Sequence, residues 1–444
     1  MKKLGAGPLS DITVLDFTWV LAGPYATRNL ADMGAKVIKI EKFKSGTNER
    51  HQALQVEKNG IVQCSYHLNL NRGKKSICID LKDPRGLEVV RGLIGKSDII
   101  LENFAPGVME RLGLDYESAK RIKPDIIYCS ISAWGHWGPN CHKPGYDAIA
   151  QAASGWIGLT ARHVGAPVAI GDTTAAMHAC TAILAALHHR TLTGQGQNID
   201  ISLVDCLFSV HETSFPSYWI SEAAGKPFVM PGVDQKSPTS SPYGVYKGRN
   251  GSISIAMLSD NRWSELVDLM GPGNEWLKTD PRTLDLAARC KSENVFLVHD
   301  ALEAWVMSQE SVEEAERKLE EAGIPCCRVK SIPELATTDA HLGGREMRQK
   351  KIQPFLGPVT MAGSPLKLSE TPAGIRGYAP FLGEHNREVL SGVLGCSTEQ
   401  IDDLYRQDVL YEAPEVQMLP EELKKYDSDQ GADFNVKRKE SKAW

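Results

Sequence analysis

Residues 12–40 read ITVLDFTWVLAGPYATRNLADMGAKVIKI, and this stretch decides the fold class. It opens with a β-branched run, Ile12–Asp16, and continues with a helical pattern from Tyr25 to Met33. Gly34-Ala35 then ends the helix before a second strand-like run, Lys36–Ile40. Strand, helix and strand in succession are typical of a parallel sheet covered by helices. We therefore expect an α/β protein.

The same alternation continues towards the C-terminus. Further strands are expected at Ser76–Ile79, Ile99–Leu101 and Ile126–Cys129, and the segments Pro84–Ile94 and Gly107–Arg121 have helical period. This pattern predicts a Rossmann-like, mostly parallel sheet with helices on both faces. In such sheets ligands bind beyond the carboxyl ends of the strands.

The pattern changes after about residue 205. An antiparallel hairpin is expected from Gly244–Tyr246 and Ile253–Ala256, around the turn Arg249-Asn250-Gly251. Because helical segments follow, we expect residues 225–330 to form a smaller α+β domain. The last residues, 427–444, are polar and predict a loosely held tail.

Composition narrows the class of protein. The chain has 444 residues, a net charge of −5 and basic residues spread along its length, which argues against nucleic-acid binding. The sequence has no run of 18 apolar residues, so we expect no membrane span. No apolar stretch follows Lys2-Lys3, so we expect no signal peptide. The ten cysteines lack CxxC spacing, so we expect reduced thiols in a cytoplasmic protein.

One helix carries the candidate chemistry. Gly171-Asp172-Thr173-Thr174 opens a stretch of helical period that stops near Gly194-Gln195-Gly196. Asp172 is therefore expected at the N-cap, where an aspartate often does no more than accept hydrogen bonds from backbone amides. The same position favours an ionised carboxylate, which can attack an acyl carbon. The residue chemistry leaves both interpretations open.

The segment 170–197 resembles the signature of family III CoA-transferases (the CaiB/BaiF type) around their aspartate nucleophile. Other blocks along the chain are similar to the same family: Val14–Phe17, Ala22–Pro24, Gly34–Glu41, Glu102–Gly107, Gly145–Asp147 and Leu382–His385. The resemblance implies that Asp172 carries CoA from an acyl-CoA to a free carboxylic acid. The CoA thioester would be a substrate, with no prosthetic group and no metal.

The resemblance also implies a CoA site. Its residues in this sequence are Val20, Leu21, Ala22, Lys42, Lys82, Asn103, Phe104, Arg111, Lys143, Tyr146 and Asp147. Basic side chains suit the phosphates of CoA, and an apolar surface suits its adenine. Leu21 departs from the family pattern, in which this position is often polar.

Other classes of protein fit the sequence less well. An α-methylacyl-CoA racemase shares the fold, but it needs a second base, and Tyr146 stands where that branch has a histidine. A non-catalytic partner subunit is disfavoured by the intact Asp172. A dinucleotide oxidoreductase would need G-x-G-x-x-G after the first strand, where Ala22-Gly23-Pro24 stands, and no G-x-S-x-G elbow indicates a serine hydrolase.

The family fold implies an interlocked dimer, either a homodimer or a heteromer with a homologous subunit. It also implies a discontinuous large domain of residues 1–205 with 335–444, and linkers at 206–224 and 331–334. Four tryptophans are expected near the acyl site: Trp19, Trp134, Trp137 and Trp156. If two of them line it, a bulky or aromatic acid fits better than formate or oxalate, as in a benzylsuccinate-type transferase with succinyl-CoA as donor.

Overall fold

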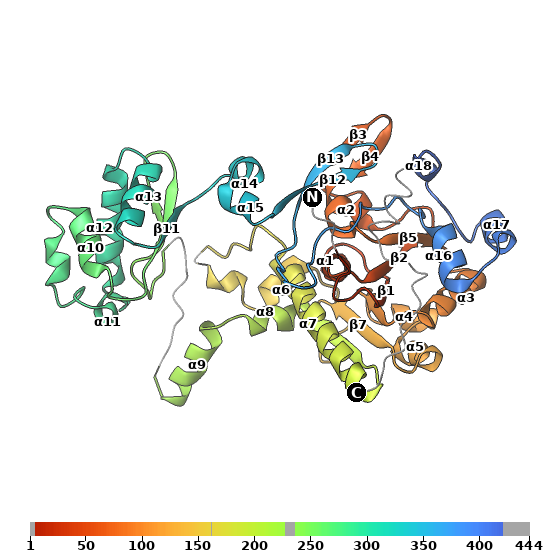
Figure 1. Cartoon of the computed structure of the whole chain (residues 1–444). Helices are drawn as coiled ribbons and strands as arrows, with labels where there is room; N and C mark the ends of the chain where they lie inside the picture. Colours follow the sequence, from red (N-terminus) through yellow and green to blue (C-terminus); the bar gives the residue numbers. More distant parts are fainter. Residues whose placement is uncertain (1–4, 161, 227–235, 421–444) are drawn as a thin grey trace. The chain divides into compact units, whose positions relative to one another are not determined.

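The computed structural model describes residues 5–160, 162–226 and 236–420 (Figure 1). They form two compact units. The first comprises the described residues of Met1–Ser154, Pro167–Val210 and Ala340–Trp444, and the second those of Gly155–Ala166 and His211–Asp339. The domain limits expected from the sequence differ from these units, because they place residues 155–166 and 335–339 in the large domain and treat residues 206–224 and 331–334 as linkers. The expected tail, 427–444, lies outside the described residues.

A six-stranded parallel sheet forms the centre of the first unit, in the order β5-β2-β1-β6-β7-β8. Its strands are β1 Thr13–Asp16, β2 Lys36–Lys42, β5 Lys75–Ile79, β6 Ile99–Glu102, β7 Ile127–Ser132 and β8 Asn198–Ser202. The predicted parallel α/β sheet is confirmed, and β8 is an addition to it. The chain adds strands on one side of β1 and then on the other, so a topological switch point lies between β1 and β6.

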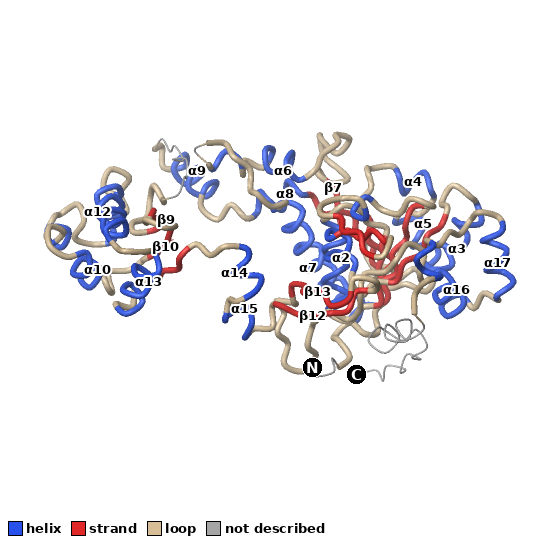
Figure 2. The backbone as a smooth tube through the Cα atoms, turned by 90° about the horizontal axis from the view of Figure 1, so that it is seen from above, coloured by secondary structure: helices blue, strands red, loops and turns tan. Residues whose placement is uncertain are grey.

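Helices cover both faces of this sheet (Figure 2). On one face α3 (Pro84–Ile94), α16 (Asn386–Leu394) and α17 (Thr398–Arg406) share an apolar core with the strands. On the other face α1 (Ala22–Asp32) and α7 (Ile170–Thr193) pack against each other and against the strands. Because both faces are buried, the strands are rich in Ile, Val and Leu.

The C-terminal part of the chain returns to the edge strand β5. Leu410 bridges Ile79 in antiparallel fashion, the amide of Asp80 donates to the carbonyl of Val409 (2.9 Å), and the amide of Tyr411 donates to that of Cys78 (3.2 Å). The backbone of β5 is thus covered on its outer side by residues about 330 positions later in the chain.

Helix α7 begins earlier than the sequence suggests. Its N-cap is Ala169, and Asp172 is the third helical residue, so the expected N-cap role of Asp172 is wrong. The helix ends at Gly194 with φ 73°, as expected for a glycine C-cap. By length and a mean hydropathy of 1.3, α7 is the one helix of the described ranges that could span a membrane, but it packs against α1, α6 (Asp147–Ala153) and α8 (Leu203–Ser209).

Smaller elements complete the first unit. Two antiparallel hairpins are formed by β3 (Gln55–Lys58) with β4 (Ile61–Cys64), and by β12 (Arg348–Gln353) with β13 (Gly357–Ala362). The remaining helices are α2 Ser65–Asn71, α4 Val108–Leu112, α5 Tyr116–Ile122, α6 Asp147–Ala153, α8 Leu203–Ser209, α15 Ala340–Gly344 and α18 Pro414–Gln417, with a 3₁₀ turn at Asn48–Arg50.

The second unit contains a three-stranded antiparallel sheet of order β11-β10-β9. Its strands are β9 Tyr243–Lys247, β10 Ser252–Ala256 and β11 Cys326–Arg328, so the expected hairpin is present. Three helices share its apolar core: α10 Trp263–Met270, α12 Val295–Ser308 and α13 Val312–Glu321. The other helices are α9 Ser214–Ala223, α11 Leu286–Arg289 and α14 Ile332–Thr337, with 3₁₀ turns at Ile157–Leu159 and Glu275–Lys278.

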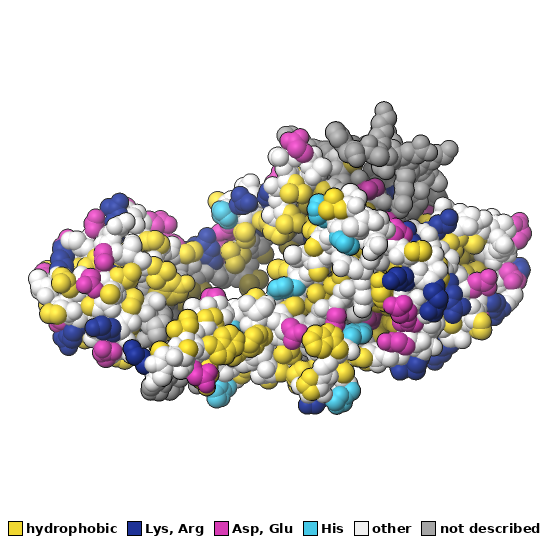
Figure 3. Space-filling model, turned by 90° about the horizontal axis from the view of Figure 1, so that it is seen from below, with side chains coloured by type: hydrophobic (Ala, Val, Ile, Leu, Met, Phe, Trp, Pro, Cys, Tyr) yellow, Lys and Arg dark blue, Asp and Glu magenta, His cyan; other side chains and the backbone are white. Residues whose placement is uncertain are grey.

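Charged side chains are mixed on the surface. On the face drawn in Figure 3, Lys and Arg side chains are interspersed with Asp and Glu, and apolar side chains lie between them. The described residues of this face form no continuous basic surface.

Candidate active site

A pocket of about 160 Å³ opens at the carboxyl ends of β1, β6 and β7. It lies at the switch point of the sheet, the place where open α/β sheets bind ligands. Its lining residues come from five segments: Trp19, Val20, Leu21 and Ala22 after β1; Asn103, Phe104, Ala105 and Pro106 after β6; Ile131, Ser132, Ala133, Trp134, Cys141, Lys143, Pro144, Gly145 and Tyr146 from the end of β7 onwards; Asp172 in α7; and Leu203 in α8.

Eight of the residues expected from the sequence line this pocket together: Val20, Leu21, Ala22, Asn103, Phe104, Lys143, Tyr146 and Asp172. Lys42, Lys82 and Arg111 are exposed and lie outside the lining. The CoA contacts expected of these residues stay predictions.

Asp147 lies beside the pocket, at the first position of α6. Its Oδ1 accepts hydrogen bonds from the backbone amides of Gly171 (2.7 Å) and Asp172 (3.2 Å), while Gln151 Nε2 donates to its Oδ2 (2.6 Å). A Cβ atom at Gly171 would lie 2.9 Å from this Oδ1. The contact between α6 and the start of α7 therefore depends on a glycine at this position.

The Asp172 carboxyl is partly buried, and burial together with the negative charge of Asp147 raises its pKa to about 7. The sequence suggested that free amides at the start of the helix would favour the ionised form. In the structure those amides are already bonded: Ile170 to the carbonyl of Val168, Gly171 and Asp172 to Asp147, and Thr173 to the carbonyl of Ala169. Asp172 is therefore more basic than an ordinary aspartate.

The loop between β1 and α1 is clamped to the end of β6. Asn103 Oδ1 accepts the amide of Trp19 (2.9 Å), Asn103 Nδ2 donates to the carbonyl of Trp19 (2.8 Å), and the indole Nε1 of Trp19 donates to the carbonyl of Asn103 (3.3 Å). The amide side chain of Asn103 is thus used by this loop, so its part in the site is to shape the pocket wall.

Tyr66, on α2, is a residue that the sequence did not single out. Its pKa is raised to about 12 by burial and by the charges of Asp172, Glu49 and Asp147. Its phenol therefore keeps its proton at neutral pH, close to the candidate nucleophile. Nothing in the sequence signals this, because Tyr66 and Asp172 lie more than 100 residues apart along the chain.

The sequence analysis also did not single out Lys39 and Glu49, although the sequence contains a signal for Lys39. Lys39 lies in β2 between apolar residues, and a charge on a strand buried on both faces requires a buried partner. The partner is Glu49, with Lys39 Nζ 3.0 Å from Glu49 Oε1 and both side chains fully buried.

The four tryptophans separate. Trp19 and Trp134 line the pocket, whereas 80% of Trp137 is exposed. Trp156 belongs to the second unit, where its ring packs edge-on against His211 at 5.7 Å between centroids. Two of the four thus form the pocket wall.

In the described ranges no group of three or more His, Cys, Asp or Glu residues is placed to hold a metal ion.

The sequence pattern of CoA-transferase family III matches residues 9–386. A succinyl-CoA–D-citramalate CoA-transferase from Chloroflexus aurantiacus is 32% identical, covering 91% of this chain and 98% of its own. A succinate–glutarate CoA-transferase from Agrobacterium fabrum is 33% identical, covering 86% and 95%. The crystal structure of a CaiB/BaiF family protein from Brucella suis superposes with a TM-score of 0.76 at 30% identity, covering 88% of this chain and all of its own. The chain is a CoA-transferase and belongs to family III.

Proposed function

We propose that this protein moves CoA from succinyl-CoA to a dicarboxylic acid that carries a bulky apolar substituent, with Asp172 as the covalent nucleophile. The observation that carries the proposal is the Asp172 carboxyl, which faces a pocket at the switch point of the sheet and has a pKa raised to about 7. A more basic carboxylate is a stronger nucleophile, and at neutral pH about half of the molecules carry Asp172 in its ionised form.

The cycle has four acyl transfers on this one carboxylate. Asp172 attacks the thioester carbonyl of the donor and forms a mixed anhydride, and the CoA thiolate leaves. The thiolate attacks the aspartyl carbonyl, which releases the donor acid and leaves an aspartyl-CoA thioester. The acceptor carboxylate attacks this thioester to give a new anhydride and free thiolate. The thiolate then attacks the acceptor acyl carbon, which yields the new acyl-CoA and restores Asp172.

Each tetrahedral state needs hydrogen-bond donors for its oxyanion. The amides of residues 170–173 are already bonded, so they are poor candidates. The start of α1 is the better one, because Leu21 and Ala22 line the pocket and no side chain caps this helix. Since one thioester is exchanged for another, the cycle needs no ATP, metal or redox cofactor.

The choice of substrates rests on two supports. The relatives from Chloroflexus aurantiacus and Agrobacterium fabrum are named for succinyl-CoA or succinate and a second dicarboxylic acid. The pocket wall here adds apolar surface from Trp19, Phe104 and Trp134, which favours an acceptor with an apolar or aryl substituent over formate or oxalate.

The test is to incubate the protein with succinyl-CoA and to map the product by mass spectrometry. We expect a CoA adduct on the peptide that contains Asp172, converted to a hydroxamate by hydroxylamine, and no adduct in Asp172→Ala. A panel of acceptors then decides the substrate: preference for formate or oxalate over alkyl- or aryl-substituted succinates would contradict this choice. An adduct on another residue would contradict the nucleophile.

The proposal includes the dimer implied by the family. Apolar side chains on α7 support it, since Met177, Leu184 and Leu192 are exposed by 55%, 40% and 72%. Sedimentation equilibrium of the purified protein measures the assembly directly, and a monomer at micromolar concentration would contradict it.

A further inference from the structure

The loop of residues 17–21, here called the β1–α1 loop, holds one residue in an unfavourable conformation. Val20 has φ 64°, in the left-handed region that a β-branched side chain rarely adopts. Glycine would adopt this angle freely. A valine stays there only when the surrounding structure enforces it, and such residues cluster at functional sites. Val20 lines the pocket that contains Asp172.

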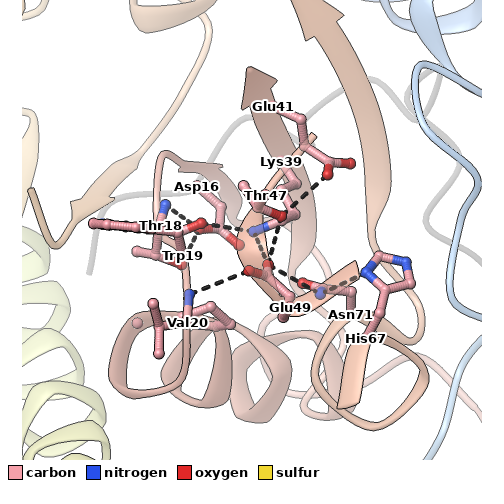
Figure 4. Close-up of polar contacts among 12 residues, drawn as sticks. Asp16, Thr18, Trp19, Val20, Lys39, Glu41, Thr47, Glu49, His67 and Asn71 are labelled. Carbon is pink, nitrogen blue, oxygen red and sulfur yellow. Dashed lines mark hydrogen bonds and ion pairs between the residues drawn. The ribbon is translucent and has the colours of Figure 1, made fainter. Parts of the chain in front are cut away.

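Two buried charges hold the backbone of this loop (Figure 4). The amide of Val20 donates to Glu49 Oε2 (3.1 Å), and Lys39 Nζ donates to the carbonyl of Thr18 (2.7 Å). Lys39 and Glu49 also form an ion pair with each other at 3.0 Å, with both side chains fully buried. One cation and one anion thus bind a carbonyl and an amide only two residues apart.

The Glu49 carboxylate is itself fixed by its other contacts. Its Oε1 accepts a hydrogen bond from Thr47 Oγ1 (2.7 Å) and one from Asn71 Nδ2 (3.3 Å), besides the Lys39 ammonium. One oxygen is therefore used for positioning the carboxylate, and the other is directed at Val20. Removing two charges from water is costly, and an apolar pair of similar size would often be as stable. Stability alone therefore gives no reason for charges at these two positions.

We propose that Glu49 and Lys39 are positioning residues of the transferase: they force the β1–α1 loop into its strained form, so that the pocket wall opposite Asp172 has its shape before acyl-CoA binds. The inference rests on the proposed function, because its consequence is measured on CoA transfer. A wall that is already in place removes the cost of ordering it at each turnover.

Glu49→Gln is the main variant, and Glu41→Gln is its matched control. Glu41 is as deeply buried and pairs with Arg50 at 2.6 Å, but it bonds no residue of the loop. Glu49→Gln weakens the hold on the loop and should lower kcat/KM for acyl-CoA by about ten- to a hundredfold. Glu41→Gln should lower the melting temperature as much, with kcat/KM per folded molecule changed by less than about threefold. Equal losses of kcat/KM in both variants would overturn the proposal.

A double-mutant cycle with Val20→Gly isolates the strain. Since glycine needs no force to adopt φ 64°, Glu49→Gln should cost several-fold less activity in the Val20→Gly background than in wild type. Additive losses would mean that Glu49 acts on general stability only, and would refute the inference. If Glu49→Gln yields no folded protein, Glu49→Asp takes its place, because it keeps the charge but moves the carboxylate away from the Val20 amide.

Hydrogen exchange gives a readout that needs no turnover. In Glu49→Gln the peptide that covers residues 17–24 should exchange faster, whereas in Glu41→Gln it should match wild type. Unchanged exchange in Glu49→Gln would contradict the proposal. If wild type moves no CoA between acids, the proposed function fails, and the exchange comparison still decides the role of Glu49.

Discussion

Asp147 accepts a hydrogen bond from the backbone amide of Asp172 (3.2 Å), and the negative charge of Asp147 also raises the pKa of the Asp172 carboxyl. One side chain thus sets the position of the candidate nucleophile through the backbone and its basicity through the electric field. The two effects are separable, because an amide side chain keeps an oxygen that accepts the backbone amides and removes the charge.

Replacing Asp172 by Ala should abolish CoA transfer and leave the fold intact. Asp172 is not the N-cap of α7, and its side chain makes no hydrogen bond that the helix depends on, so the usual cost of about 1 kcal/mol for a lost cap does not apply. Transfer assays and thermal melts are the measurements. Turnover near the wild-type rate would exclude Asp172 as nucleophile.

The pH dependence should follow the ionisation of Asp172. In the proposed mechanism the Asp172 carboxylate is the reactive form, and its pKa is about 7, so kcat/KM should fall about tenfold per unit below that pH. Asp147→Asn removes the neighbouring charge, lowers the pKa of Asp172 and should move this limb to lower pH. A limb that stays in place would show that burial alone sets the pKa.

Ionisation of Asp172 should also affect the stability of the fold. A rise in pH that increases activity should lower the free energy of unfolding. The pKa of Asp172 is raised from 3.8 in the unfolded chain to about 7 in the fold, so its ionisation costs stability as the pH rises through this window. Asp172→Asn should therefore increase the free energy of unfolding at pH 8 by about 1–3 kcal/mol and change it little at pH 4. Chemical denaturation at the two pH values measures the difference, and equal values would place Asp172 in a solvated environment.

The protein should not racemise 2-methylacyl-CoA esters. Racemisation needs a second base on the far side of the α-carbon. The racemase branch has a histidine where this sequence has Tyr146, which is 63% exposed, and a tyrosine is a poor base at neutral pH. Incubation in deuterated solvent followed by mass spectrometry of the acyl group measures exchange at this carbon. Rapid exchange that is lost in Asp172→Ala would favour the racemase alternative.

Trp134 should contribute to acceptor recognition, and Trp137 should not. Trp134 lines the pocket with Lys143 Nζ 5.9 Å from its ring centre, whereas Trp137 is mostly exposed. Trp134→Ala should raise the KM for a substituted succinate about tenfold, from the loss of apolar contact area. Trp137→Ala is the control with the same change in composition, and an equal effect of both variants would refute the assignment.

Much of the central sheet follows from local sequence. The expected strands at Ile12–Asp16, Lys36–Ile40 and Ser76–Ile79 lie within a residue or two of β1, β2 and β5, because strands buried on both faces are continuous apolar runs. Strand β8 was missed: Asn198–Ser202 is not a continuous apolar run like the central strands but alternates polar and apolar residues, which is also a strand pattern. Its place at the edge of the sheet explains the alternation.

The site was predictable where it follows strand ends and unpredictable where it depends on packing. Val20, Asn103 and Asp172 come together because the sheet brings the ends of β1 and β6 to the start of α7. Tyr66 and Glu49 lie on segments whose approach to the pocket is not encoded in any local period. The N-cap error at Asp172 has a similar origin, since Asp147, from another helix, supplies the oxygen that a cap would have supplied.

The pairing of Leu410 with Ile79 has a consequence for synthesis on the ribosome. When the first 210 residues have emerged, the strands of the sheet are all present, but β5 still presents an open edge. The segment that covers it is translated about 330 residues after β5 itself, which at 5–20 residues per second takes on the order of half a minute. Open edges are templates for pairing with other chains. During that interval the β5 edge of the nascent chain is therefore open to pairing with other chains.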